Sequence, residues 1–241
     1  MVTTRQATPQ LSFANVSDSY QYHPWSIIEN HLDLTQLGQR ETVFTIGNGY
    51  LGTRGNFEEG YGLSLPMTLI HGVYDDVPLM YTELANCPDW LSLSFLIDGE
   101  RFTLDTGEIL AYERQLDVRR GLLTRHVTWR SPQGKELTFR FERFASAAHR
   151  HQLNLRCEVT PLNFTSPIEV RASLNGYPAN QGFNHWAILD QGQQGEYVWL
   201  HSQTCHTHID VAMAMRLKVL GFEHSPDAVE IESLVLPSQP V

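Results

Sequence analysis

Apolar and polar residues alternate along most of this chain. Between residues 91 and 97 the alternation gathers four apolar side chains on one side, those of Leu91, Leu93, Phe95 and Ile97. Later segments repeat the pattern with these apolar sets: Leu137, Phe139 and Phe141; Leu153, Leu155, Cys157 and Val159; Ile168, Val170, Ala172 and Leu174; Ile209, Val211, Met213, Met215 and Leu217. Successive side chains of a strand point to opposite faces, so each segment is predicted to be a strand with one wet face.

Turn-forming residues separate these segments. Asp98-Gly99 indicates a type I′ hairpin, and Ser-Pro-Gln-Gly at 131–134 separates two other strands. Helical periodicity is nearly absent, and the best candidate is a short helix over residues 25–37, which Gly38 would cap. Short strands with frequent turns are typical of an antiparallel sandwich or barrel. We therefore predict an all-β fold, a large antiparallel β-sandwich with few short helices.

Composition fits one such domain over residues 1–241, with its core at about residues 20–225. A hydrophobic fraction of 41% is enough for a sizeable core, and a formal charge of −10 argues against a general nucleic-acid binder. No apolar run is long enough to span a membrane. The first residues carry no secretory apolar segment, and the three cysteines suggest no disulfide framework, so we expect a cytoplasmic protein.

The stretch "TIGNGYLGTRG" contains Gly47, Gly49 and Gly52 in the spacing G-x-G-x-x-G of dinucleotide-binding folds. That function requires a helix after the third glycine, whose N-terminus faces the pyrophosphate. Here the following segment, 53–66, contains three more glycines and a proline. We therefore predict tight turns and a strand edge with no NAD cofactor, and Asn48 as a left-handed turn residue.

The longer stretch "ETVFTIGNGYLGTRGNFEEG", residues 41–60, resembles the N-terminal signature of glycoside hydrolase family 65. That family includes the phosphorylases of maltose, trehalose and kojibiose. The likeness continues in order through "GVYDD" at 72–76, "PDWLSLSFLIDGERF" from residue 88, "LTFRFERFAS" at 137–146, "SPIEVRASLNG" at 166–176 and His185-Trp186.

The resemblance implies a fragment of a larger enzyme. Enzymes of this family begin with a large sandwich similar to that of galactose mutarotase, followed by a helical linker and an (α/α)6 barrel. The barrel holds the catalytic glutamate and the phosphate site, so the resemblance places catalysis beyond Val241 and makes this domain non-catalytic. It further implies inverting glycosyl transfer from an α-linked glucose disaccharide to phosphate or water. Inorganic phosphate would be a co-substrate and no cofactor is expected. The expected partners are the barrel and a second copy of the protein.

Two pairs of adjacent acids are candidates for catalytic groups, Glu58-Glu59 and Asp75-Asp76. Neighbours on an extended chain point to opposite faces, so neither pair can flank one glycosidic oxygen. We interpret them as solvated loop residues or, alternatively, as part of the rim of the substrate pocket.

The tryptophans Trp90 and Trp186 stand beside turn-like sequence, which suggests exposure, and they are further candidates for the rim. By contrast, Trp129 and Trp199 alternate with polar neighbours, as core aromatic residues do.

The remaining candidates are interpreted as structural. Arg54 is expected to pair with Glu58 or Glu59, or with the barrel. His206 and His208 would share a strand face and could bind zinc as a pair, but a third ligand is not readable, so no metal site is predicted. The residues of the glycine-rich motif that we expect to be structural are Gly47, Asn48, Gly49, Gly52, Arg54 and Gly55.

Two other functions stay open from the sequence. The first is a stand-alone carbohydrate-binding module, which would bind maltose or trehalose by itself. The second is a small sugar epimerase of the mutarotase kind, which would need a histidine and a carboxylate converging on the concave face of the sandwich.

Overall fold

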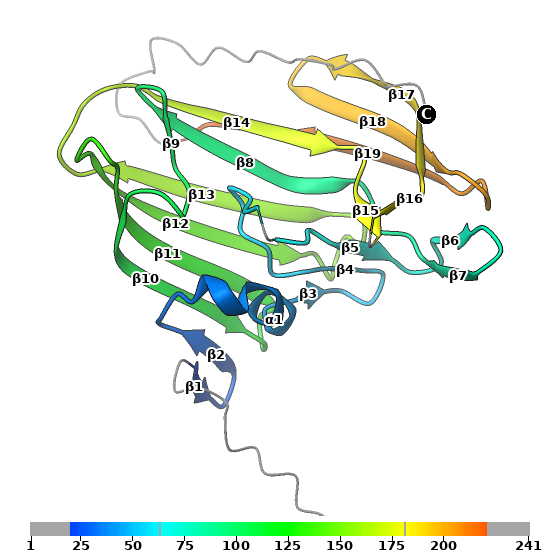
Figure 1. Cartoon of the computed structure of the whole chain (residues 1–241), viewed down its shortest axis with the longest axis horizontal. Helices are drawn as coiled ribbons and strands as arrows, with labels where there is room; N and C mark the ends of the chain where they lie inside the picture. Colours follow the sequence, from blue (N-terminus) through cyan, green and yellow to red (C-terminus); the bar gives the residue numbers. More distant parts are fainter. Residues whose placement is uncertain (1–19, 63, 181, 221–241) are drawn as a thin grey trace, which may run out of the picture.

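The computed structural model describes residues 20–62, 64–180 and 182–220, and these form two facing layers of antiparallel strands (Figure 1). One layer is a six-stranded sheet in the order β1 (Tyr20–His23), β2 (Ser26–Glu29), β10 (Glu108–Asp117), β11 (Leu122–Arg130), β12 (Glu136–Ala145) and β13 (Leu153–Pro161). The other contains β14 (Ile168–Asn175), β8 (Asp89–Ile97) and β9 (Glu100–Arg101), and beside them β17 (Trp186–Gln194), β18 (Tyr197–Thr204) and β19 (Asp210–Arg216). The predicted all-β sandwich is confirmed.

Small sheets and hairpins gather at one end of these layers (Figure 1). They are β3 (Ile46–Gly47), β4 (Leu51–Thr53) and β5 (Thr68–Ile70), the hairpin β6 (Tyr74–Val77) and β7 (Tyr81–Leu84), and the pair β15 (Ala179–Asn180) and β16 (Phe183–Asn184). Helical structure in the described residues is limited to η1 (Leu34–Gln36) and α1 (Leu37–Val43).

The main core lies between β8 and the sheet β10–β13. The apolar face of β8 is buried along its length, with Phe95 at 1% and Ile97 at 0% exposure. Phe95 packs edge-to-face against Phe139 and Phe141 of β12, at centroid distances of 5.1 and 6.0 Å. Trp129 of β11 closes the same cluster and is fully buried. The alternation in the sequence therefore identified the inward residues of these strands.

Both predicted turns are present. Asp98 and Gly99 have φ angles of +48° and +85°, as a type I′ turn requires at both central positions. At the second turn, the N–H of Gly134 donates to the carbonyl of Ser131 over 2.9 Å.

The helix predicted over residues 25–37 is wrong. Residues 26–29 form β2, which pairs with β10 so that Ile27 faces Leu116. The helical segment starts later because Asp33 caps it, its carboxylate accepting the N–H of Thr35 over 2.9 Å. The adjacent apolar residues Ile27 and Ile28 thus belong to strand β2. The helical segment follows the cap at Asp33 and ends at Val43.

Candidate functional site

The glycine-rich stretch forms a tight connection between β3 and β4. Gly49 takes the left-handed conformation, with φ of +86°, whereas Asn48 does not, so the prediction for Asn48 is wrong. Asn48 instead uses its side chain: its oxygen accepts the N–H groups of Tyr50 and Leu51, and its amide donates to the carbonyl of Ser146 over 2.7 Å. The third glycine, Gly52, lies in β4 and precedes a loop, so the strand–turn–helix arrangement of dinucleotide binding is not formed.

The first acidic pair lies inside the protein. Glu58 and Glu59 are 3% and 2% exposed. The guanidinium of Arg125 binds both, with Nη1 at 2.7 Å from Glu59 Oε1 and Nη2 at 2.7 Å from Glu58 Oε2. Arg143 Nη1 approaches Glu58 Oε1 at 3.5 Å. The interpretation of this pair as solvated loop residues is wrong, because both carboxylates are neutralised by buried arginines.

Charges shape the acid–base behaviour of this cluster. Burial would raise the pKa of Glu58, but the attraction of Arg125 and Arg143 outweighs it, and the pKa lies below its ordinary value. Burial lowers the pKa of Arg143 to about 10, against the attraction of Glu58. Arg125 is shifted upwards, because Glu59 and Glu58 more than offset the burial that lowers its pKa. Glu58 is therefore held as a carboxylate, which rules it out as a proton donor.

The arginines that hold these acids were not predicted from the sequence. Arg114, Arg125 and Arg143 stand on adjacent strands, at 1%, 2% and 1% exposure. Arg125 and Arg114 are register partners on β11 and β10. Arg125 occupies an inward position of the alternation, between Leu123 and Val127, and this was the available signal. An arginine at an apolar position of a strand indicates a buried partner.

The predicted pairing of Arg54 with Glu58 or Glu59 is wrong. The guanidinium of Arg54 donates to the carbonyl of Gly38 and lies 3.7 Å from Glu41 Oε2. It therefore fastens the glycine-rich stretch to α1.

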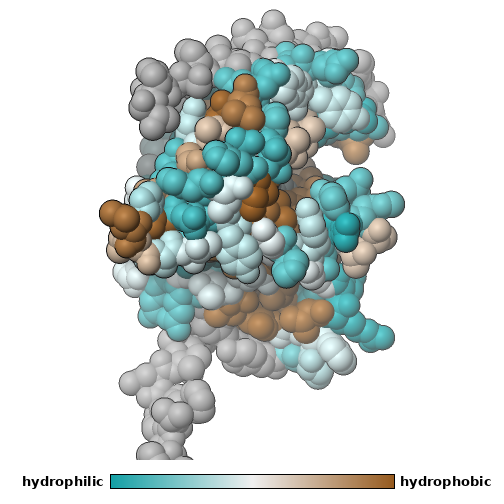
Figure 2. All heavy atoms as spheres, turned by 90° about the vertical axis from the view of Figure 1, so that its right-hand side faces the viewer, coloured by the Kyte–Doolittle hydropathy of each residue, from teal (hydrophilic) through white to brown (hydrophobic). Residues whose placement is uncertain are grey.

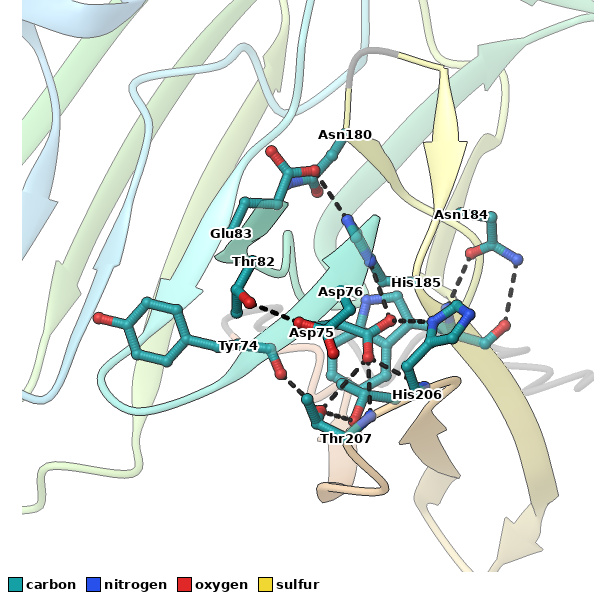
Figure 3. Close-up of polar contacts among 12 residues, drawn as sticks. Tyr74, Asp75, Asp76, Thr82, Glu83, Asn180, Asn184, His185, His206 and Thr207 are labelled. Atoms are coloured by element: carbon teal, nitrogen blue, oxygen red, sulfur yellow. Dashed lines mark hydrogen bonds and ion pairs between the residues drawn. The ribbon is translucent and has the colours of Figure 1, made fainter. Parts of the chain in front are cut away.

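The second acidic pair belongs to the β6–β7 hairpin and forms the polar cluster drawn in Figure 3. Asp75 is fully buried. Its Oδ1 accepts the backbone N–H groups of His206 and Thr207, at 3.0 and 2.9 Å, and its Oδ2 lies 3.0 Å from Nδ1 of His185. The other ring nitrogen of His185 lies 2.8 Å from Glu83 Oε1. We call Asp75, Glu83, His185, His206 and Thr207 the His185 cluster.

Protonation in the His185 cluster follows from these contacts. Burial raises the pKa of Asp75, but the N–H of Thr207, then His185 and His206, lower it to about 2. Asp75 is thus an acceptor only, and it fixes a proton on Nδ1 of His185. A hydrogen bond between Nε2 of His185 and Oε1 of Glu83 requires a proton on one of these two atoms. His185 is 0% exposed and cannot itself contact a sugar, whereas His206 and Thr207 lie at the surface.

The cluster joins three parts of the fold. Asp75 and Glu83 are register partners in the hairpin β6–β7, His185 lies between β16 and β17, and His206 and Thr207 lie in the turn between β18 and β19. These contacts fix the orientation of the β6–β7 hairpin relative to β17 and to the β18–β19 turn.

The remaining rim candidates differ in accessibility. Asp76 lies on the hairpin and accepts the hydroxyl of Thr82. Trp90 is half-buried, with its indole N–H 3.3 Å from Thr53 Oγ1. Trp186 is fully buried and donates to the carbonyl of Asn86 over 2.6 Å, so the prediction that it is exposed is wrong. It begins β17 and packs in one buried cluster with Val73 and Ala85, which flank the hairpin.

The two histidines proposed as a zinc pair do not share a strand face. Both lie in the turn between β18 and β19, where His208 has φ of +55° and His206 points Nδ1 at Asp75 Oδ2 over 3.3 Å. Within residues 20–62, 64–180 and 182–220, no group of three or more His, Cys, Asp or Glu side chains has a metal-binding arrangement. The same described residues contain no helix long and apolar enough to cross a membrane.

The fold and the buried charge clusters thus define an antiparallel sandwich whose potential catalytic acids are mostly committed to internal contacts. Comparison with protein families supplies the particular assignment. The family model "Glycosyl hydrolase family 65, N-terminal domain" matches residues 27–238, and the chain belongs to this family.

Two similar proteins are described as disaccharide phosphorylases. The chain is 31% identical over 211 residues to a kojibiose phosphorylase of Halothermothrix orenii, covering 86% of the chain and 27% of that protein. It is 34% identical over 176 residues to an α,α-trehalose phosphorylase of Thermoanaerobacter brockii, covering 67% of the chain and 23% of that protein. The chain thus spans about a quarter of the length of these relatives.

A solved structure shares the fold. It is described as a putative kojibiose phosphorylase from the human microbiome, and it matches with a TM-score of 0.76 at 22% identity. The match covers 83% of this chain and 28% of that one.

Proposed function

We propose that this chain is the non-catalytic N-terminal domain of a family 65 enzyme that acts on an α-glucosidic disaccharide of the maltose, trehalose or kojibiose class. In the whole enzyme it would support a catalytic (α/α)6 barrel. The glycosyl group would pass with inversion to inorganic phosphate or water, phosphate being a co-substrate and not a bound cofactor. We further propose a cytoplasmic enzyme that self-associates.

The observation that carries this proposal is the internal use of the acids. An inverting glycosidase needs two accessible carboxyl groups about 6.5–9.5 Å apart, and a phosphorylase needs one accessible acid. Glu58 and Glu59 are neutralised by Arg125, and Asp75 is saturated by donors. We therefore expect the general acid outside this chain, which agrees with relatives of which the matched segment is only about a quarter.

We propose contact with substrate for two residues of the chain only. Asp76 and Trp90 keep partial exposure and are the surviving candidates for the rim of the barrel pocket. For the epimerase alternative, His185 is a poor catalytic histidine, because it contacts two carboxylates but is completely buried.

The test compares the 241-residue chain with the full-length polypeptide that carries it. Each is incubated with maltose, trehalose and kojibiose, with and without phosphate, and release of glucose and glucose 1-phosphate is measured. We expect turnover of one disaccharide by the full-length protein and none by the chain alone. Turnover by the isolated chain that survives repurification would refute the proposal, and saturable binding of a disaccharide by the chain alone would favour a binding module instead.

A further inference from the structure

The β6–β7 hairpin ends in an exposed apolar tip. Within the described part of the chain the hairpin pairs with no third strand, and it projects at one end of the molecule (Figure 1). Leu79 is completely exposed, and Met80 and Tyr81 have relative exposures of 72% and 50%. Figure 2 faces this end of the molecule and shows separate apolar areas among hydrophilic surface. We call residues 77–81 the hairpin tip.

The backbone at Leu79 has a conformation that glycine would adopt more easily. Its φ is +62°, in the left-handed region. A residue with a Cβ is strained at such a position, and a side chain exposed to water gains nothing from burial in return. A strained residue that carries a large apolar side chain into solvent suggests a use beyond folding.

The base of the hairpin is rigidly fixed. Asp75 and Glu83, opposite each other on β6 and β7, both bind His185. At the end of β7, the side-chain amide of Asn180 donates to the carbonyl of Leu84 over 2.8 Å. A tip held in one orientation before contact loses little conformational entropy when it binds, which favours docking.

We propose that the hairpin tip docks into an apolar pocket on the C-terminal portion of the same enzyme, an inference that rests on the proposed function. The length of the relatives selects this occupant. Roughly three quarters of that length lies outside the matched region, so a large covalent neighbour is at hand.

Hydrogen–deuterium exchange on the full-length polypeptide and on the 241-residue chain tests the proposal. We expect the amides of Leu79, Met80 and Tyr81 to exchange at least about ten-fold more slowly in the full-length protein, since docking suppresses local opening. The double variant Leu79→Gly/Met80→Ser should abolish this difference. In the isolated chain the same variant should melt no lower than the wild type, because glycine relieves the left-handed position.

The matched control is Leu162→Ser, an exposed leucine at the end of β13, which should leave protection of the tip unchanged. Protection elsewhere on the domain in the full-length protein, with none at the tip, would overturn this inference and leave the proposed function intact. Absence of any protection would overturn both. Protection in the isolated chain that rises with concentration would assign the tip to a second copy and also overturn it.

Discussion

At the scale of single residues, position 55 requires glycine because there is no room for a side chain, and not because its backbone conformation favours glycine. A Cβ at this position would lie 2.7 Å from both Arg114 Nη2 and Phe44 Cβ and 2.8 Å from the carbonyl of Glu41. We predict that Gly55→Ala lowers the free energy of unfolding by about 1–3 kcal/mol, the cost of overpacking. Urea denaturation measures it, with Gly62→Ala, which meets no atom within 4 Å, as the control. Equal midpoints for the two variants would contradict this packing.

The positive charge of Arg125 neutralises the buried carboxylates of Glu58 and Glu59. Replacing it by methionine leaves Glu58 and Glu59 buried without their partner, and removing one side of such a pair costs about 3–5 kcal/mol. The matched control is Arg156→Met on β13, because Arg156 is 67% exposed and pairs with Glu158 at the surface. Surface pairs contribute at most about 1 kcal/mol. Equal losses in thermal denaturation would show that the cluster contributes little.

Asp75 predicts a specific dependence of stability on pH. Its pKa is lowered from 3.8 to about 2, so its contribution is complete above pH 3.8 and is lost as the pH falls towards 2. The size is about 2 kcal/mol. We expect Asp75→Asn to unfold at lower urea concentration at pH 6 and to lose less stability than the wild type between pH 4 and pH 2. Parallel pH profiles of the two proteins would contradict this assignment.

At the scale of elements, the His185 cluster should control one hairpin and not the sandwich. Replacing His185 by leucine leaves Asp75 and Glu83 without their shared partner. We predict faster amide exchange over residues 74–84, with unchanged exchange in β11 and β12, because local opening of a hairpin does not require global unfolding. Exchange that rises equally in all strands would show that the cluster belongs to the global core.

Strands were predictable from the sequence because each depends on its own alternation. Leu91 to Ile97 and the apolar face of β12 are buried as expected. The charged contacts were not predictable in the same way. Glu58 and Arg125 are 67 positions apart, and His185 and Asp75 are 110 apart, so only the tertiary fold brings them together. Adjacent acids look solvated in a sequence, whereas burial depends on partners that local patterns do not reveal.

At the scale of the whole molecule, Glu58, Glu59 and Asp75 are bound by partners inside the domain, and we propose that the chemistry belongs to the rest of the enzyme. The glycine-rich stretch, which contains Glu58 and Glu59, is held to the sandwich by two arginines. Arg54 fastens the stretch to α1, and Arg125 fastens it to the main sheet. The glycine-rich stretch is therefore joined both to α1 and to the main sheet.

The most direct test of that claim measures kcat and thermal stability together for Glu58→Gln in the full-length enzyme, assayed well below its melting temperature. The account predicts a lower melting temperature, because a buried ion pair with Arg125 is lost, and a kcat close to that of the wild type. A catalytic acid or base would behave in the opposite way, because its loss reduces the rate by about 10²–10⁴-fold. An unchanged melting temperature with a loss of kcat in that range would contradict the account.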